Sequence, residues 1–165
     1  MLEALLFAAG EPITAADLKK ITGLPESDIK DIVDELRSDY HERGGGILIS
    51  EVAGGYQMHT NPDNCEWAKK FRAEPPAKFS PAALETLAVI AYKQPITRAE
   101  VDTLRGVNSD GVVKTLLEKR LIKIVGRKEA PGKPLLYGTT QEFLTHFGLK
   151  DLTGLPTLKE FEAAE

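Results

Sequence analysis

The chain has 165 residues, of which 42% are hydrophobic and 28% charged, and its formal net charge is −4. This composition is typical of an ordinary folded domain and excludes a disordered or membrane-embedded chain. The apolar run near the start, ALLFAAG, is too short to span a bilayer and follows no basic segment, so we expect no signal peptide. Cys65 is the single cysteine and cannot form an internal disulfide, which favours a cytoplasmic protein.

The sequence repeats itself with an offset of 83 residues. EPITAADLKKITGLPESDIKDIVDELRSDY begins at Glu11, and QPITRAEVDTLRGVNSDGVVKTLLEKRLI begins at Gln94. The two stretches share Pro, Ile, Thr, Ala and Gly at matching positions, and apolar residues align between these fixed points. A period of this length indicates two similar small domains in tandem. Domains this small are marginally stable alone, so packing or association would stabilise them.

The first copy predicts three helices followed by a hairpin. Apolar spacing and glycine or proline boundaries predict helices at 2–9, 15–22 and 25–40. Two β-rich runs, ILISEV and YQMHT, surround the turn AGG and predict a β-hairpin. A further helix is expected at 63–72. This order is typical of a winged helix-turn-helix domain.

The second copy repeats the pattern. Ser80 and Pro81 predict the start of a helix, EVDTLRG and SDGVVKTLLEKR predict two more, and residues 121–140 predict a hairpin. QEFLTHFG predicts a short helix in the tail. We therefore predict a mainly α chain with small β-hairpins (α+β): a winged-helix domain at 1–73, a linker at 74–79, and a second winged-helix domain with the tail at 80–165.

Charge is distributed unevenly along the chain. Residues 1–75 carry 8 Lys/Arg against 14 Asp/Glu, a net of −6, and residues 76–165 carry 13 against 11, a net of +2. The third helix of the first copy is acidic and should repel phosphate. Any weak contact with DNA would therefore use basic residues of the second copy, namely Lys114, Arg120, Lys123, Arg127 and Lys128. A solvated charged face, with acidic residues interspersed, is the alternative interpretation of this set.

Residues with metal or catalytic potential are scattered. His41, His59 and His146 lack ligand spacing, Cys65 has no partner cysteine, and GGGILI is followed by neither Lys-Ser/Thr nor a helix. No carboxylate stands in a context that indicates a catalytic pocket. We therefore expect no enzyme, no metal and no cofactor.

Apolar residues outside the predicted cores are the stronger signal. Phe7 lies beside the buried stripe predicted for the first helix, and Ile90 lies beside the stripe Leu84, Leu87, Ala88 and Ala91 of the second copy's first helix. The tail also holds Phe143, Phe147 and several leucines. Core packing is one interpretation of these residues, and an apolar surface for a partner chain is the other.

Several short sequence segments resemble those of a known protein family. IAYKQPIT, RGVNSDGV and VGRKEAPGKPLLYGTT in the second copy, EALLFAAGEPIT and GGYQMHTNP in the first, and FLTHFGLKDLTGLPTL in the tail resemble the bacterial segregation and condensation protein B (ScpB) family. The resemblance covers residues 2–160. Its one departure is the short start, which predicts that a few N-terminal turns of the family pattern are absent.

The resemblance implies a non-catalytic subunit of a condensin-like complex that acts in chromosome partition, cell division and the cell cycle. In this complex Smc is the ATPase and ScpA is the kleisin that bridges its heads. The resemblance further implies a nucleoid-associated homodimer paired through the first domains, with the kleisin wrapped around the winged helices and DNA contacted mainly indirectly. The candidate partner-binding residues are Phe7, Ile90, Tyr92, Phe143, Phe147 and Leu149.

A transcription regulator is the competing hypothesis. A tandem winged-helix regulator would place the Lys/Arg set of the second copy on duplex DNA. It should carry a basic third helix in both copies, and the acidic first copy argues against it.

Overall fold

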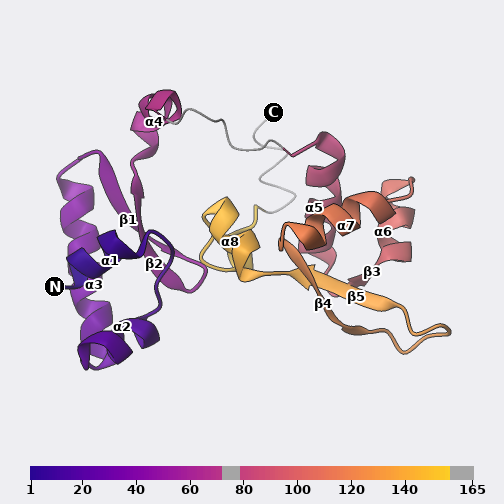
Figure 1. The fold of residues 1–165 in the computed structure, drawn as a ribbon, viewed down its shortest axis with the longest axis horizontal. Helices are drawn as coiled ribbons and strands as arrows, with labels where there is room; N and C mark the ends of the chain where they lie inside the picture. The colour runs from indigo at the N-terminus through magenta and orange to yellow at the C-terminus, as the bar shows by residue number, and fades with distance from the viewer. Residues whose placement is uncertain (72–78, 157–165) are drawn as a thin grey trace. The chain divides into compact units, whose positions relative to one another are not determined.

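The computed structural model describes residues 1–71 and 79–156, which divide into two compact units (Figure 1). The first unit contains residues 1–71 and 148–156, and the second contains residues 79–147. Each combines helices with a small antiparallel sheet, which confirms the predicted α+β class. The sequence predicts domains at 1–73 and 80–165, whereas residues 148–156 group with the first unit. The predicted linker lies outside the described residues except at Phe79.

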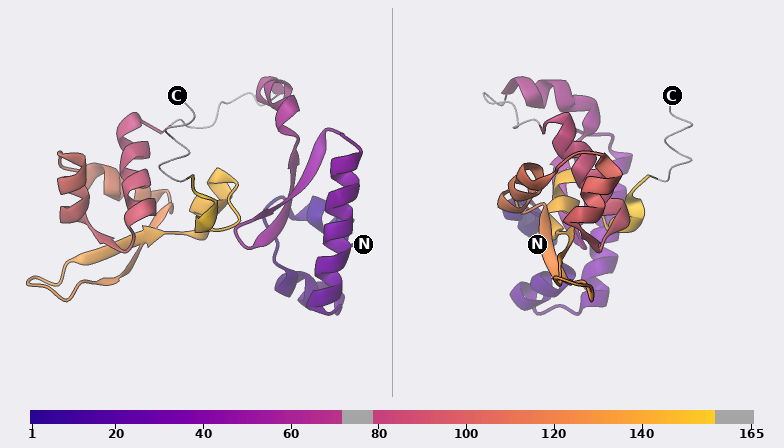
Figure 2. Two further views of the ribbon diagram at one scale, coloured as in Figure 1. Left: turned by 180° about the vertical axis from the view of Figure 1, so that it is seen from behind. Right: turned by 90° about the vertical axis from the view of Figure 1, so that its right-hand side faces the viewer.

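The first unit opens with three helices and a hairpin. Its elements are α1 (Leu2–Ala9), α2 (Ala15–Thr22), α3 (Glu26–Glu42), β1 (Ile47–Val52), β2 (Gly55–Thr60), η1 (Pro62–Asn64), α4 (Cys65–Phe71) and, from the tail, η2 (Leu152–Gly154). The bounds of α1, α2 and the two strands lie within one residue of the prediction. Figure 2 shows the long α3 beside the β1–β2 hairpin.

Residues shared by the two copies form the caps of the second helix. The Thr14 hydroxyl accepts the N–H of Asp17 and begins α2, and Gly23 ends it with a φ of 75°. A residue with a side chain would be strained in this left-handed conformation, which is why glycine stands there.

The hairpin turn contains Ala53 and Gly54, with φ of 51° and 72°. Positive φ at both turn residues suits the right-handed twist of two paired strands. On the other edge of β2, Ile13 pairs with Tyr56 through backbone hydrogen bonds of 3.0 and 2.9 Å. The core between helices and sheet is apolar and includes Leu2, Leu6, Leu18, Ile29, Val33, Ile49 and Tyr56.

The second unit repeats the order of three helices, a hairpin and a following helix, and adds the short strand β3 to its sheet. Its elements are α5 (Pro81–Lys93), β3 (Ile96–Thr97), α6 (Arg98–Arg105), α7 (Asp110–Glu118), β4 (Ile122–Arg127), β5 (Leu135–Thr139) and α8 (Gln141–Phe147). The strand order is β3-β5-β4, so β4 lies at an edge, and the connection from β4 to β5 extends beyond the helices (Figure 1). Thr97 begins α6 with a capping box to Glu100, and Gly106 ends it with a φ of 67°.

The buried face of α5 differs from the expected one. Leu84 and Ala88 are exposed, and the buried residues are Ala83, Thr86, Leu87, Ile90 and Ala91. Thr86 can be buried because its hydroxyl donates to the Ala82 carbonyl at 2.8 Å and accepts a hydrogen bond from Arg105. A polar residue inside the stripe therefore shifts the sequence-based prediction onto the wrong face.

The described part of the tail is attached to the first unit. The carbonyls of Leu149 and Lys150 accept the N–H groups of Ala53 and Gly54 at 2.8 and 3.1 Å. Lys150 also forms an ion pair of 2.9 Å with Glu51. In the described ranges, 1–71 and 79–156, we find no helix that is both long and apolar enough to cross a membrane.

Candidate partner-binding surfaces

Helix α1 is apolar on both of its sides. Leu2 and Leu6 are buried in the core, while Phe7 is 73% exposed, and Met1, Ala4 and Ala8 are exposed beside it. The Tyr40 hydroxyl donates to a Glu3 carboxylate oxygen at 2.5 Å, which fixes α1 against α3 and raises the pKa of Tyr40. Exposed apolar side chains that gather on the side away from the core indicate a contact surface, so the outer face of α1 around Phe7 is a candidate contact with another chain.

The outer surface of α3 is acidic. Asp31, Asp34, Glu35, Ser38 and Asp39 line a shallow depression on it. Arg37 is paired with Asp34 at 2.9 Å, which leaves the remaining carboxylates dominant. Such a surface repels phosphate and suits a protein partner with positive charge.

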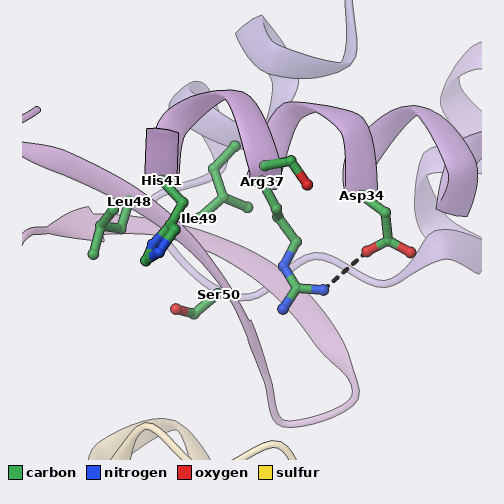
Figure 3. Close-up of a pocket in the computed structure, with 7 residues that line it drawn as sticks. Asp34, Arg37, His41, Leu48, Ile49 and Ser50 are labelled. Atoms are coloured by element: carbon green, nitrogen blue, oxygen red, sulfur yellow. Dashed lines mark hydrogen bonds and ion pairs between the residues drawn. The ribbon is translucent and has the colours of Figure 1, made fainter. Parts of the chain in front are cut away.

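A groove of about 530 Å³ lies between α3 and β1 (Figure 3). Its helical wall consists of Asp34, Arg37, Ser38 and His41, and its strand wall of Leu48, Ile49 and Ser50. The Ser50 hydroxyl lies 2.7 Å from Nε2 of His59, whose Nδ1 lies 3.0 Å from the Thr60 carbonyl. If Nδ1 donates to that carbonyl, Nε2 can accept from Ser50, so a neutral histidine satisfies both hydrogen bonds.

Two of the expected partner-binding residues are in the core of the second unit. Ile90 is 0% exposed and Phe143 is 3% exposed. Ile90 lies on the buried face of α5, and Phe143 packs its ring against Phe147 with centroids 4.9 Å apart. Neither offers surface to a partner in this structure, so both are removed from the candidate set.

The remaining candidates differ in their surroundings. Tyr92 is 43% exposed and lies on the outer face of α5 with Leu84 and Ala88, and Phe147 is exposed at the end of α8. The Leu149 side chain is half-buried, and its carbonyl is bonded to Ala53 in the first unit. The sequence pattern does not predict the Leu84–Ala88–Tyr92 surface, because it assigns Leu84 and Ala88 to the core.

The five basic candidates are all exposed, but some of them are engaged in ion pairs or hydrogen bonds. Lys128 forms an ion pair of 2.5 Å with Glu100, and Arg127 donates to the Lys133 carbonyl at 3.2 Å. Hydrogen bonds from Lys128 and from the Thr97 backbone and side chain lower the pKa of Glu100 to about 2. Lys114 lies on α7, Arg120 follows α7, and Lys123 lies on β4; all three are exposed. This set therefore offers dispersed positive charge and no compact pocket for a phosphate within the described residues.

Potential metal ligands are dispersed in the part of the chain that the structure describes. No cluster of three or more His, Cys, Asp or Glu side chains lies close enough there to hold a metal ion. Cys65 is exposed and unpaired with another cysteine.

Comparisons with known proteins agree in one family. Residues 1–158 match the family described as "Segregation and condensation complex subunit ScpB". Segregation and condensation protein B of Syntrophotalea carbinolica is 50% identical over 98% of this chain and 82% of its own length.

Solved structures of the family also match. ScpB of Mycobacterium tuberculosis is 37% identical, with 90% of this chain and 92% of that chain covered and a TM-score of 0.42. A dimer of an ScpB N-terminal domain complexed with an ScpA peptide is 28% identical, with 43% of this chain and 89% of that chain covered and a TM-score of 0.41. The resemblance in the sequence motifs is thus confirmed by relatives aligned over nearly the whole chain, and the chain belongs to the ScpB family of segregation and condensation complex subunits.

Proposed function

We propose that this protein is the non-catalytic ScpB subunit of an Smc–ScpA–ScpB complex, in which its homodimer binds and braces the kleisin ScpA. The observation that carries this proposal is the family match over residues 1–158, together with 50% identity to a relative that the chain covers at 82% of its length. In that role the protein would act in chromosome segregation and would be located in the cytoplasm, associated with the nucleoid.

Each unit is further proposed to be a winged helix. Three helices followed by an antiparallel hairpin support this assignment in both units. The tight glycine-ended turn between the second and third helix, at Gly23 and Gly106, supports it as well.

Pairing of two copies is assigned to the first unit, through the outer face of α1. Phe7 and Met1 are the large exposed apolar side chains on that face, 73% and 74% exposed, and Ala4 and Ala8 are exposed beside them. Covering this face would remove apolar surface from water and add stability that small domains lack.

Kleisin binding is assigned to the second unit. The outer face of α5, with Leu84, Ala88 and Tyr92, and the exposed Phe147 of α8 replace the larger set expected from the sequence. Bracing would act by holding the kleisin segment in one conformation, which would influence how the Smc ATPase ring opens and closes.

Mixing experiments test this function. Purified protein and purified ScpA, combined and passed through a sizing column with light scattering, should elute as one complex. The double substitution Leu84→Ser with Tyr92→Ser should weaken that complex while leaving the dimer intact. A matched control is Leu104→Ser with Val107→Ser, two exposed apolar residues of the same unit at the end of α6 and in the turn after it. Equal loss of binding in both variants would contradict the α5 surface.

A further inference from the structure

The groove between α3 and β1 runs along the edge of a strand. Leu48, Ile49 and Ser50 are consecutive in β1, and all three line it. Successive side chains of a strand point to opposite faces of the sheet, so a groove over one face would contact only alternate residues. Contact with three in a row therefore means that the groove follows the outer edge of β1, with α3 as its second wall (Figure 3).

The backbone of this edge has no strand partner in the described residues. β1 pairs only with β2, in a sheet of two strands. Tyr56 of β2 exchanges its backbone hydrogen bonds with Ile13, so Glu51, opposite Tyr56, forms a pair that is not hydrogen-bonded. Strict alternation then directs the N–H and C=O groups of Ile47, Ile49 and Glu51 outward, toward the groove side.

The same edge already accepts backbone contacts where β1 ends. Ala53 is the next outward-facing position after Glu51, and its N–H donates to the carbonyl of Leu149 at 2.8 Å. Lys150 reinforces that contact through its ion pair with Glu51. The groove at Ile47–Ile49 thus continues an edge that the chain's own tail uses at its other end.

The charges around the groove determine which kind of polypeptide segment could bind in it. Asp34 lines the groove and is paired with Arg37. The adjoining depression on α3 shares Asp34 and Ser38 with the groove and adds the carboxylates of Asp31, Glu35 and Asp39. On the strand side Ile47 is 42% exposed and Leu48 is half-buried. A second copy of this edge would bring two acidic α3 helices together, so like-charge repulsion disfavours it.

We propose that the outer edge of β1 binds an extended segment of a partner polypeptide in which Lys or Arg alternates with aliphatic residues. The segment would add as a further strand, with main-chain hydrogen bonds to Ile47, Ile49 and Glu51. Its aliphatic side chains would contact Leu48 on one face of the sheet, and its cations, on the opposite face, would lie toward the carboxylates of α3. This site is separate from the α1 and α5 surfaces and does not depend on their assignment.

A peptide titration on the full chain tests the site. The probes are a fluorescent KVKVKVK peptide with blocked ends, an EVEVEVE counterpart, and a KVKVKVK peptide N-methylated at its valines. We expect the basic peptide to bind and the acidic peptide not to bind. N-methylation leaves charge and apolar surface in place but removes strand hydrogen bonds, and should weaken binding by more than about tenfold.

Two variants of α3 localise the binding. Ser38→Lys adds a positive charge inside the groove, and Ser27→Lys adds the same charge on the same helix outside it. Ser38→Lys should weaken KVKVKVK binding by about fivefold, and Ser27→Lys by much less. Amide hydrogen exchange at Ile47, Ile49 and Glu51 should slow in the complex and stay fast in the free protein.

Five results would overturn the proposal. The first four are no binding of KVKVKVK at millimolar concentration, equal binding of its N-methylated form, equal binding of EVEVEVE, and equal effects of the two lysine variants. Protection of Ile47 and Ile49 that rises with protein concentration alone would also overturn it, because that result would assign the edge to a second copy.

Discussion

Ile13 and Tyr56 exchange two backbone hydrogen bonds in the first unit, and their counterparts Ile96 and Tyr137 lie opposite each other in the second. Ile13 and Ile96 are 83 residues apart, which is the offset of the sequence repeat. The shared phrase PIT thus has a structural reason: its Ile adds a short strand to the hairpin, and its Thr caps the next helix. The sequence repeat therefore corresponds to the same short strand and helix cap in each of the two units.

Glycine should be required at the end of α6 only because the backbone there is left-handed, not because a side chain would lack space. Gly106 has a φ of 67°, and a Cβ added there would meet no atom within 4 Å. Gly106→Ala should therefore lower the free energy of unfolding by about 1 kcal/mol through strain rather than through a clash. Gly111→Ala is the control, because Gly111 lies within α7 in equally open space without a positive φ. That control should be neutral or stabilising in urea denaturation, and equal destabilisation by both would contradict this account.

Stability in acid should depend on Glu100. Its folded-state pKa of about 2 lies below the ordinary value of 4.5, so its contribution is complete above about pH 4.5 and is lost as the pH falls toward 2. Glu100→Gln keeps a side chain that can complete the capping box but cannot titrate. Melting temperatures measured between pH 2 and 7 should therefore fall less steeply for the variant. Some slope should remain, because the pKa values of Asp17, Asp102 and Asp151 are also lowered by hydrogen bonds. An unchanged slope would rule out the Glu100 contribution.

The register of α5 can be tested with two matched truncations. Ile90 is fully buried and Leu84 is 45% exposed on the same helix. Ile90→Ala should cost about 2–5 kcal/mol of unfolding free energy because it leaves a cavity, and Leu84→Ala should cost less than about 1 kcal/mol. Chemical denaturation of both variants measures the difference. Similar costs would support the face predicted from the sequence instead.

Element boundaries could be predicted from the sequence because the signals there are local. Gly10, Gly23 and Gly106 end helices with positive φ, and Ser80 caps α5, as the residue types indicate. The buried face of α5 could not be predicted, because it includes the polar residue Thr86. Its hydroxyl can be buried since it accepts a hydrogen bond from Arg105, a residue of another helix. Phe7 and Ile90 stand at equivalent positions of the repeat, yet one is exposed and the other buried.

The partner surfaces are the least predictable feature. Phe143 is expected at a surface from the sequence and lies in the core, because α8 packs its aromatic side chain inward. The groove beside β1 combines residues of α3 and β1 whose proximity depends on how the helix packs against the hairpin. Composition indicates surplus apolar residues, and only the tertiary structure shows which of them remain exposed.

Any direct interaction with DNA should be weak and independent of sequence. Replacing Lys114, Arg120 and Lys123 with Gln should lower affinity on all duplexes alike, and the slope of log K against log salt should fall by about 0.9 for each phosphate that is no longer neutralised. Lys128→Gln should have a smaller effect because Lys128 is paired with Glu100. Fluorescence anisotropy on two unrelated duplexes at several salt concentrations measures both quantities. Strong preference for one duplex would favour the transcription-regulator hypothesis.

The proposed function requires a homodimer that is paired through α1 of the first unit and binds the kleisin. Light scattering with in-line chromatography on wild type, Phe7→Ser and Leu104→Ser, each alone and mixed with ScpA, measures both properties. Phe7 and Leu104 are both exposed, one on each unit, so the removal of apolar surface is matched. Wild type and Leu104→Ser should have twice the mass of one chain and take up ScpA, and Phe7→Ser should be a folded monomer. A wild-type monomer, a dimeric Phe7→Ser variant, or a wild-type dimer that ignores ScpA would contradict the account.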